Sequence, residues 1–213
     1  MLKRHLAGPL AGALVAAALA TAPLAPAQAA APDGTDSLAA LLAADGQALD
    51  SNWKDFDIVE AAVLTVAGAK PKTPLLALTK GKKRLTAFVP TDLAFRKLVA
   101  DLTGTNPATE QATVDALLAL ADVDTIEAVL LYHVVVGDTL ESPDVVAAAK
   151  KRTKVTMASG VTVRVKLKKG RVVIVDKDRD DTDAKAINKA LDLNVGNRQV
   201  AHGINRVLRP LNL

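Results

Sequence analysis

Apolar residues recur every three or four positions in the first half of the chain, which predicts helices. One such segment lies between residues 38 and 49, and a second runs from Ile58 to Val66. Gly68 and Pro71 follow the second segment, as expected where a helix ends. Three further helices are predicted: one that begins after Thr91 with Asp92 in its first turn, one around residues 110–121, and one that runs from a capping-box-like motif at residues 124–127 through Tyr132.

From Val134 onward the pattern changes from helices to short strands, one of which alternates apolar and polar residues. Every second side chain from Val161 to Leu167 is apolar, so one face of that strand should be buried and the other should face water. Residues 168–171 read as a hairpin turn. Strands are predicted at residues 85–89, 134–136, 154–157, 161–167, 172–175 and 204–208. Because helices come first and most strands come after, the pattern predicts an α+β domain.

The N-terminal residues predict a signal peptide, with Lys3 and Arg4 before an apolar run. Small residues at Ala27 and Ala29 suit signal peptidase, so cleavage is expected after Ala29; a retained membrane anchor is the alternative. The resulting division is a signal peptide at 1–29, a flexible leader at 30–37 and a domain at 38–213. No later apolar run reaches 18 residues, so we expect a secreted, extracellular or cell-envelope protein with no membrane span after cleavage.

The amino-acid composition limits how the protein can be stabilised and which reactions it can carry out. The 213 residues include no cysteine, so stability must come from packing, and thiol redox chemistry is excluded. Half of the residues are apolar, which is enough for a substantial core. Loss of Lys3 and Arg4 on cleavage would lower the formal net charge from +4 to +2, so attraction to anions must come from local clusters of charge.

Three segments resemble the motifs of the fasciclin (FAS1) domain family. They are Leu85–Phe95, with a Phe-x-Pro-Thr-Asp-x-Ala-Phe pattern; Leu130–Val135, with a Tyr-His pair; and Asn197–Pro210, with the His-x-Ile-Asn-x-Val-Leu-x-Pro pattern. Order and spacing fit the family over roughly residues 38–213. The signature residues are Phe88, Pro90, Thr91, Asp92, Phe95, His202 and Pro210. The chain departs from the family in one extra residue at 197–199 and in Asn205, where Asp is usual.

The resemblance implies a compact wedge of strands packed with helices and a non-catalytic role in adhesion or cell-surface association, through a surface or matrix protein or an anionic polysaccharide. It also implies candidate partner contacts at Tyr132 and His133, although packing and backbone hydrogen bonds are the favoured explanation of both residues. Asp192 and Leu193 occupy the place of an Asp-Ile pair that some animal members use for integrin binding. That ligand is not carried over to a protein with a bacterial-style signal peptide.

The remaining side-chain clusters leave alternatives open. A cleft near Tyr132, His133 and His202 would suit a small ligand or a metal, but two histidines need carboxylate help to hold a metal, and no metal or cofactor is predicted. The acidic stretch at residues 176–183 offers carboxylates for calcium. It lacks the glycine and the final glutamate of an EF-hand loop, so a solvated loop is predicted.

A basic stretch is the last candidate surface. Arg164, Lys166 and Lys168 alternate along one predicted strand, and Lys169 and Arg171 follow at the turn. These residues could contact an anionic cell-wall polymer or polysaccharide. The alternative is that they keep a sheet edge soluble. All five aromatic residues lie outside this stretch, so no base-stacking platform exists within it and nucleic acid is not a predicted partner.

Catalytic motifs are absent from the sequence. It contains no Gly-x-Ser-x-Gly elbow, no phosphate-binding glycine loop and no cysteine nucleophile. We therefore predict that the protein is not an enzyme; a glycan-active enzyme with a carboxylate pair is the alternative that the acidic residues leave open. The first and last signature segments are predicted to pair side by side in the interior.

Overall fold

The computed structural model describes residues 34–46 and 48–211, which belong to one unit of the chain. The predicted signal peptide lies outside the described residues. The described helices are α1 (Leu38–Leu42), η1 (Ala43–Asp45), α2 (Asp57–Ala69), η2 (Pro74–Thr79), α3 (Asp92–Thr103), α4 (Glu110–Leu120), α5 (Val123–Leu131), α6 (Ser142–Lys150) and η3 (Asn188–Ala190). None of these helices combines the length and the apolar character that a membrane span requires.

The described strands form two sheets. The first has the order β2-β1-β7, with β1 (Leu85–Pro90), β2 (Val134–Val136) and β7 (Gln199–Ile204). The second is antiparallel and has the order β3-β4-β5-β6, with β3 (Lys154–Thr156), β4 (Thr162–Lys168), β5 (Arg171–Val175) and β6 (Ala184–Lys185). A bridge between Ala186 and Ile204 links the two. This combination of helices and sheets confirms the predicted α+β class.

Strand β1 is the centre of the first sheet and is buried along its whole length. It pairs antiparallel with β2 and parallel with β7, in a register that runs from Leu85 opposite Gln199 to Pro90 opposite Ile204. The predicted side-by-side pairing of the first and last signature segments is therefore confirmed. In β7, a Cβ atom on Gly203 would lie 2.6 Å from the Cβ of Ala190, so glycine lets η3 approach the strand closely.

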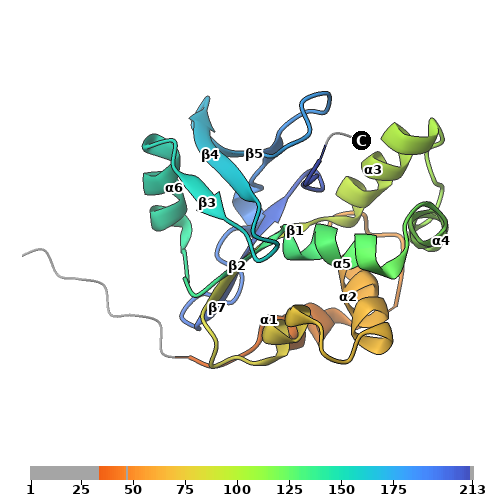
Figure 1. The fold of residues 1–213 in the computed structure, drawn as a ribbon, viewed down its shortest axis with the longest axis horizontal. Coiled ribbons are helices and arrows are strands. Elements are labelled where there is room, and N and C mark those ends of the chain that lie inside the picture. Colours follow the sequence, from red (N-terminus) through yellow and green to blue (C-terminus); the bar gives the residue numbers. More distant parts are fainter. Residues whose placement is uncertain (1–33, 47, 212–213) are drawn as a thin grey trace, which may run out of the picture. The chain divides into compact units, whose positions relative to one another are not determined.

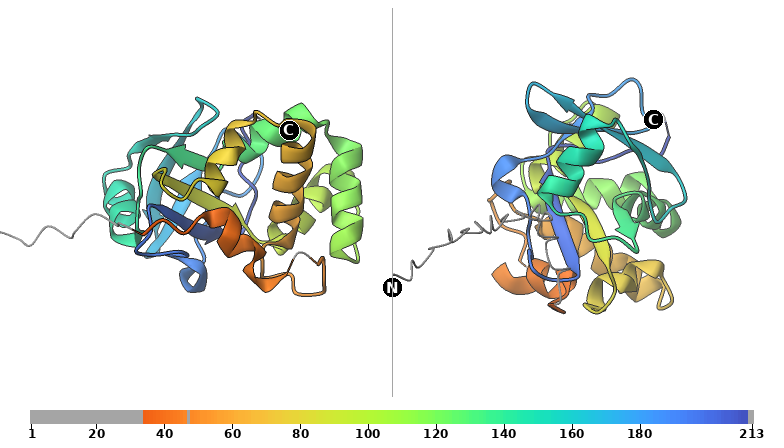
Figure 2. Two further views of the ribbon diagram at one scale, coloured as in Figure 1. Left: turned by 90° about the horizontal axis from the view of Figure 1, so that it is seen from below. Right: turned by 90° about the vertical axis from the view of Figure 1, so that its left-hand side faces the viewer.

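Two apolar cores lie on the two sides of β1. Alternate residues such as Ala87 and Val89 belong to the core that helices α2, α3 and α5 share. Phe88 belongs to the other core, together with the inner faces of β4 and β5 and with helix α6. Helices α2–α5 accordingly gather on one side of the first sheet, with β3–β5 and α6 on the other (Figure 1). The two further views show the same division (Figure 2).

Several predicted boundaries were wrong. Helix α6 was not predicted, and it interrupts the expected order of helices followed by strands. The last strand is Gln199–Ile204, not residues 204–208, because the polar residues of β7 are buried through hydrogen bonds. The cap of α5 is Asp122, whose carboxylate accepts from the N–H of Thr125 at 2.8 Å, and not the motif that starts at Asp124.

The first described residues belong to the hydrogen-bonded body of the protein. Gly34 exchanges backbone hydrogen bonds with Gly196 and Arg198, and the N–H of Asp36 donates to the side chain of Asn197. Of the predicted flexible leader, residues 30–33 lie outside the described residues. Residues 34–37 lead directly into α1, where the Ser37 hydroxyl accepts from the N–H of Ala40.

Candidate basic cleft

Tyr132 and His133 are interior residues. They lie where α5 ends and β2 begins, and their exposed fractions are 0% and 5%. The Tyr132 hydroxyl donates to the carbonyl of Thr162 at 3.3 Å. His133 Nδ1 lies 2.7 Å from the Val129 carbonyl, and Nε2 accepts from the N–H of Leu208 at 2.8 Å. Burial lowers the pKa of His133 to about 4, so the ring is neutral and both of its nitrogens are used inside the fold.

His202 is used in the same way. It is 1% exposed; its Nε2 lies 2.7 Å from the Leu140 carbonyl, and its Nδ1 accepts from the N–H of Asp192 at 3.3 Å. Burial lowers the pKa of His202 as well. Because Tyr132, His133 and His202 are all closed off from solvent, none of them offers an atom to a ligand outside the protein. The alternative of a small-ligand or metal cleft at these residues has no support in this geometry.

Asp192 and Leu193 make hydrogen bonds and packing contacts within the fold. Asp192 accepts hydrogen bonds from the N–H and the hydroxyl of Ser142, at the start of α6. Leu193 exchanges two backbone hydrogen bonds of 2.9 Å with Ala201 and packs against the first core. These contacts give both residues a structural role, and their suggested part in partner binding stays an untested expectation.

The basic stretch forms one face of the second sheet. Along β4, Val163 and Val165 point into the core at 1% exposure, whereas Arg164 and Lys168 are exposed and Lys166 is half-buried. Two residues of strand advance by roughly 7 Å, so these three cations form an evenly spaced row. Lys154 lies directly across from Arg164, and Arg171 lies across from Lys168.

The hairpin turn extends this basic face. Lys169 and Gly170 adopt positive φ angles of 51° and 75°, as in the two-residue turns that match the twist of a hairpin. The prediction of a turn at residues 168–171 is therefore confirmed. Lys169 is exposed at the tip.

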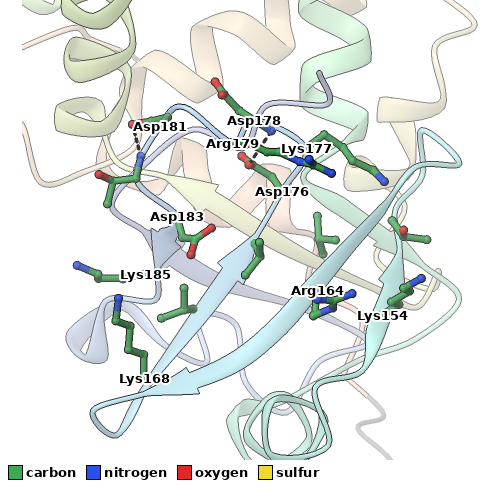
Figure 3. Close-up of a pocket in the computed structure, with 15 residues that line it drawn as sticks. Lys154, Arg164, Lys168, Asp176, Lys177, Asp178, Arg179, Asp181, Asp183 and Lys185 are labelled. Atoms are coloured by element: carbon green, nitrogen blue, oxygen red, sulfur yellow. Dashed lines mark hydrogen bonds between the residues drawn. The ribbon is translucent and has the colours of Figure 1, made fainter. Parts of the chain in front are cut away.

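A cleft of about 660 Å³ opens between this sheet face and the loop of residues 176–183. Its strand side is lined by basic side chains of β3, β4 and β6, and its loop side carries the aspartates (Figure 3). Among the described residues, no acidic side chain forms an ion pair with Lys154, Arg164, Lys168 or Lys185. These four cations are available to an anion that enters the cleft.

Arg209 fixes the loop above the sheet. This arginine is 5% exposed, and its guanidinium donates to Asp178 at 2.8 Å and to Asp101 of α3 at 2.9 Å. Its backbone N–H donates to Asp176 at 2.8 Å. Arg206 adds a bond of 2.6 Å to Asp101 and lies 3.3 Å from Asp181. The C-terminal segment thus gives the cleft a defined wall, although the sequence contains no local signal for this role.

The acidic residues of the cleft are mostly neutralised by these contacts. Burial by itself raises the pKa of Asp178, but hydrogen bonds from the Asp180 N–H and from Arg209 outweigh burial and hold that pKa below its usual value. Asp183 pairs with Lys166 at 2.9 Å. Asp176 is the exception, since burial raises its pKa to about 6. The cleft therefore gains positive charge as the pH falls below 6.

The positions of these aspartates also test two earlier alternatives, a calcium site in the acidic stretch and a glycan-active enzyme with a carboxylate pair. Every acidic residue that lines the cleft comes from residues 176–183, so no carboxylate faces another across it. Two of them, Asp178 and Asp181, contact arginines of the C-terminal segment. Neither a pair of opposed carboxylates nor a set of unengaged calcium ligands is present in this described loop.

A second basic segment was missed by sequence reasoning. Residues 70–84 contain six lysines and arginines and no acidic residue, which is the signal that was available. Lys72, Lys80, Lys83 and Arg84 line a hollow of about 490 Å³ around η2. This surface, which we call the η2 patch, competes with the cleft as a place for an anion.

Comparison with known proteins agrees with the fold and with the motifs. A family model, the fasciclin domain, matches residues 64–210. The chain belongs to the fasciclin family. Fasciclin domains are in general non-catalytic adhesion domains that are extracellular or at the cell surface. The predicted family is therefore confirmed.

Among solved structures, the chain is similar to the FAS1 domain pair of the insect cell adhesion molecule fasciclin I, with 17% sequence identity and a TM-score of 0.49. That similarity covers 70% of this chain and 45% of the other, so this chain spans less than half the length of that structure. No curated protein matches the chain.

Proposed function

We propose that this fasciclin domain acts outside the cell as an adhesion module that holds a linear anionic polysaccharide in the basic cleft. The observation that carries the proposal is the division of the second sheet into an apolar inner face and an outer face on which four cations have no acidic partner within the described part of the chain. Two of these cations, Arg164 and Lys168, lie about 14 Å apart along β4, with the paired Lys166 between them. Cations spread over this length suit an extended polymer with repeated anionic groups better than a small ligand.

The shape of the cleft supports the same partner. Val175, which is half-buried and lies across from Arg164, forms part of its lining, so a sugar ring has an apolar side chain to contact. The loop wall is held by Arg209, which means that little ordering is required on binding.

Binding to two cellulose ethers tests the proposal. Carboxymethylcellulose carries anionic groups on a linear backbone, whereas hydroxyethylcellulose has the same backbone without charge. We expect the purified protein to bind the anionic polymer, with an affinity that falls as salt is raised, and to ignore the neutral polymer. Equal binding of the two polymers would rule out recognition of charge.

Matched charge reversals locate the site. Arg164→Glu with Lys168→Glu changes the cleft by the same net charge as Lys82→Glu with Lys83→Glu, which changes Lys83 of the η2 patch and its exposed neighbour Lys82. We expect the first pair to weaken binding by roughly tenfold or more and the second pair to have a smaller effect. The reverse ranking would transfer the function to the η2 patch.

We further propose that the protein is exported and cleaved after Ala29. The charged start, the apolar run and the small residues at Ala27 and Ala29 support this proposal. N-terminal sequencing of protein collected outside the producing cells should start at Ala30. An intact N-terminus on membrane-bound protein would instead favour the retained anchor.

A further inference from the structure

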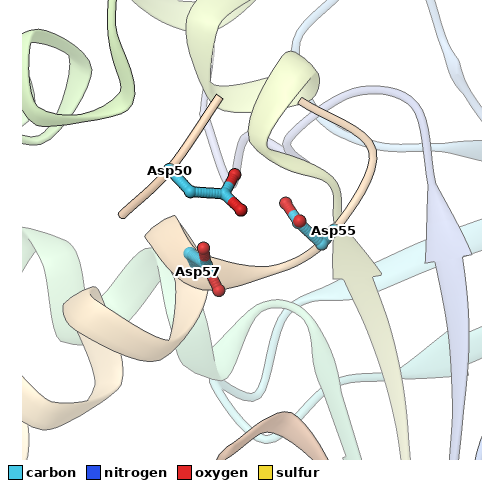
Figure 4. A group of neighbouring side chains, drawn as sticks. All are labelled: Asp50, Asp55 and Asp57. Atoms are coloured by element: carbon cyan, nitrogen blue, oxygen red, sulfur yellow. The ribbon is translucent and has the colours of Figure 1, made fainter. Parts of the chain in front are cut away.

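Three carboxylates from distant parts of the sequence meet beside the helices. Asp55 precedes α2, Asp92 is the first residue of α3 and Glu110 is the first residue of α4. One oxygen from each lies within 4.8 Å of the other two. Asp55 also lies in a second group with Asp50 and Asp57, whose side chains surround a common space (Figure 4).

Each of the three carboxylates has one oxygen without a hydrogen-bond donor. Asp92 Oδ1 accepts from the N–H of Ile58 at 2.8 Å, and Glu110 Oε2 accepts from the N–H of Asp50 at 2.6 Å. Their other oxygens, Asp92 Oδ2 and Glu110 Oε1, are buried and find no partner, and the same holds for Asp55 Oδ1. Asp92 and Glu110 are both 0% exposed.

No cation of the protein balances these charges. In the described part of the chain, no lysine or arginine lies within ion-pair distance of Asp55, Asp92 or Glu110. Converging carboxylates with no counter-charge are strongly unfavourable in a buried place. The cluster must therefore hold either protons or a bound cation. Burial, followed by the contact with Asp55, raises the pKa of Asp92 to about 9, and burial raises that of Glu110.

We propose that Asp55, Asp92 and Glu110 bind a calcium ion. Calcium takes oxygen ligands at 2.3–2.6 Å, so the oxygens around one ion lie at most about 5 Å apart. The three cluster oxygens, all within 4.8 Å of one another, are close enough to share an ion. Magnesium, with ligands at 2.0–2.1 Å, needs a sphere about 4 Å across and a stricter geometry. Calcium readily takes several carboxylate ligands in a flexible geometry, whereas magnesium usually keeps several waters, so this group of carboxylates favours calcium.

The surroundings suit a cation of high coordination number. Calcium accepts six to eight oxygens, and the neighbouring group of Asp50 and Asp57 brings further carboxylates to the shared residue Asp55. Asp50 is exposed and Asp55 is half-buried, so the acidic residues continue from the surface to the buried Asp92. A bound ion would join the segment before α2 to the first turns of α3 and α4.

Calcium titration of chelator-treated protein tests the proposal. We expect saturable binding of one ion at pH 7.5, tighter for calcium than for magnesium. At a hundredfold excess of calcium over its Kd, the melting temperature should rise by roughly 5–10 °C. Calcium should also displace protons, so the measured heat should depend on the ionisation enthalpy of the buffer.

Asparagine variants distinguish a bound calcium ion from protons shared among the carboxylates. Asp92→Asn keeps the acceptor for the Ile58 N–H but removes the charge. Asp55→Asn removes a charge at a half-buried position of the cluster. We expect each variant to weaken calcium binding by roughly tenfold or more. Asp138→Asn, at an exposed position outside the cluster, should bind calcium as the unmodified protein does.

The opposite result is equally specific. If the cluster holds only shared protons, millimolar calcium will leave the melting temperature and the heat of titration unchanged. Asp92→Asn and Asp55→Asn will then be as stable as the unmodified protein or more stable, because an amide removes repulsion without the need for a proton. That outcome would overturn the proposal.

Discussion

The signature strands β1 and β7 are buried on both faces, whereas the second sheet buries one face and exposes the other. In β1 and β7, both faces are buried, and even the polar residues Gln199 and His202 are fully enclosed. In β4, one face is buried and the other carries Arg164 and Lys168 to the surface. The residues that identify the family therefore fix the interior, whereas the surface available to a partner lies where the family motif imposes no residue.

Removal of the Phe88 ring gives the largest expected effect on the signature side of this comparison. Phe88 is 1% exposed and lies between β1 and the second sheet. Phe88→Ala should lower the free energy of unfolding by about 3–5 kcal/mol because it leaves a cavity. Urea melts measure this value, and polymer binding by the fraction that stays folded should be unchanged. A loss below about 1 kcal/mol would contradict the burial.

Arg209 joins the two regions, since it follows β7 and holds the loop above the cleft. Arg209→Met should cost about 3 kcal/mol because it leaves the buried Asp178 without its cation. It should also weaken polymer binding, because the loop wall is no longer fixed. Urea melts and polymer titrations of the same sample test both effects. Unchanged stability would show that the loop does not depend on this contact.

His133 makes the stability of the signature region depend on pH. Its pKa is about 4 in the folded protein, below the ordinary value of 6.5, so the folded state favours the neutral ring. The resulting stability is complete above pH 6.5 and is lost as the pH falls towards 4, by roughly 3 kcal/mol in total. Compared with the unmodified protein, His133→Gln should show a shallower loss of stability in urea melts between these pH values. Parallel pH profiles would exclude this origin.

Substitution of Lys166 has the smallest expected effect and tests which cations of the outer face contact the polymer. It already pairs with Asp183, and both side chains are about one-third exposed. Lys166→Met should therefore cost no more than about 1 kcal/mol in unfolding free energy. It should also weaken polymer binding less than Arg164→Met, which removes a cation without an acidic partner. An equal loss of affinity would mean that the polymer displaces Asp183.

The sequence predicted the features that depend on local pattern or on the motifs. The apolar alternation from Val161 to Leu167 and the turn at Gly170 needed no distant information, and the likeness to fasciclin motifs was enough to pair the segments around Phe88 and His202. Helix α6 was missed because only Val145 and Ala149 of its nine residues are buried, which leaves little periodicity to detect.

Features that depend on contacts between residues far apart in the sequence could not be predicted from local patterns. The position of β7 was wrong because Gln199 is buried, and its side chain bonds Leu38, Ala77 and Lys80 from two other elements. Asp92 was expected to act in the first turn of its own helix, yet its carboxylate accepts from the start of α2. Its approach to Asp55 and Glu110 likewise exists only in the folded chain.

Nuclear magnetic resonance of the ¹⁵N-labelled protein during titration with carboxymethylcellulose oligomers tests the central claim most directly. The account predicts that amide shifts change along residues 162–168 and 176–185, while those of β1 and of residues 70–84 stay in place. Changes confined to residues 70–84, or centred on Tyr132 and His133, would contradict the assignment of the basic cleft as the contact surface.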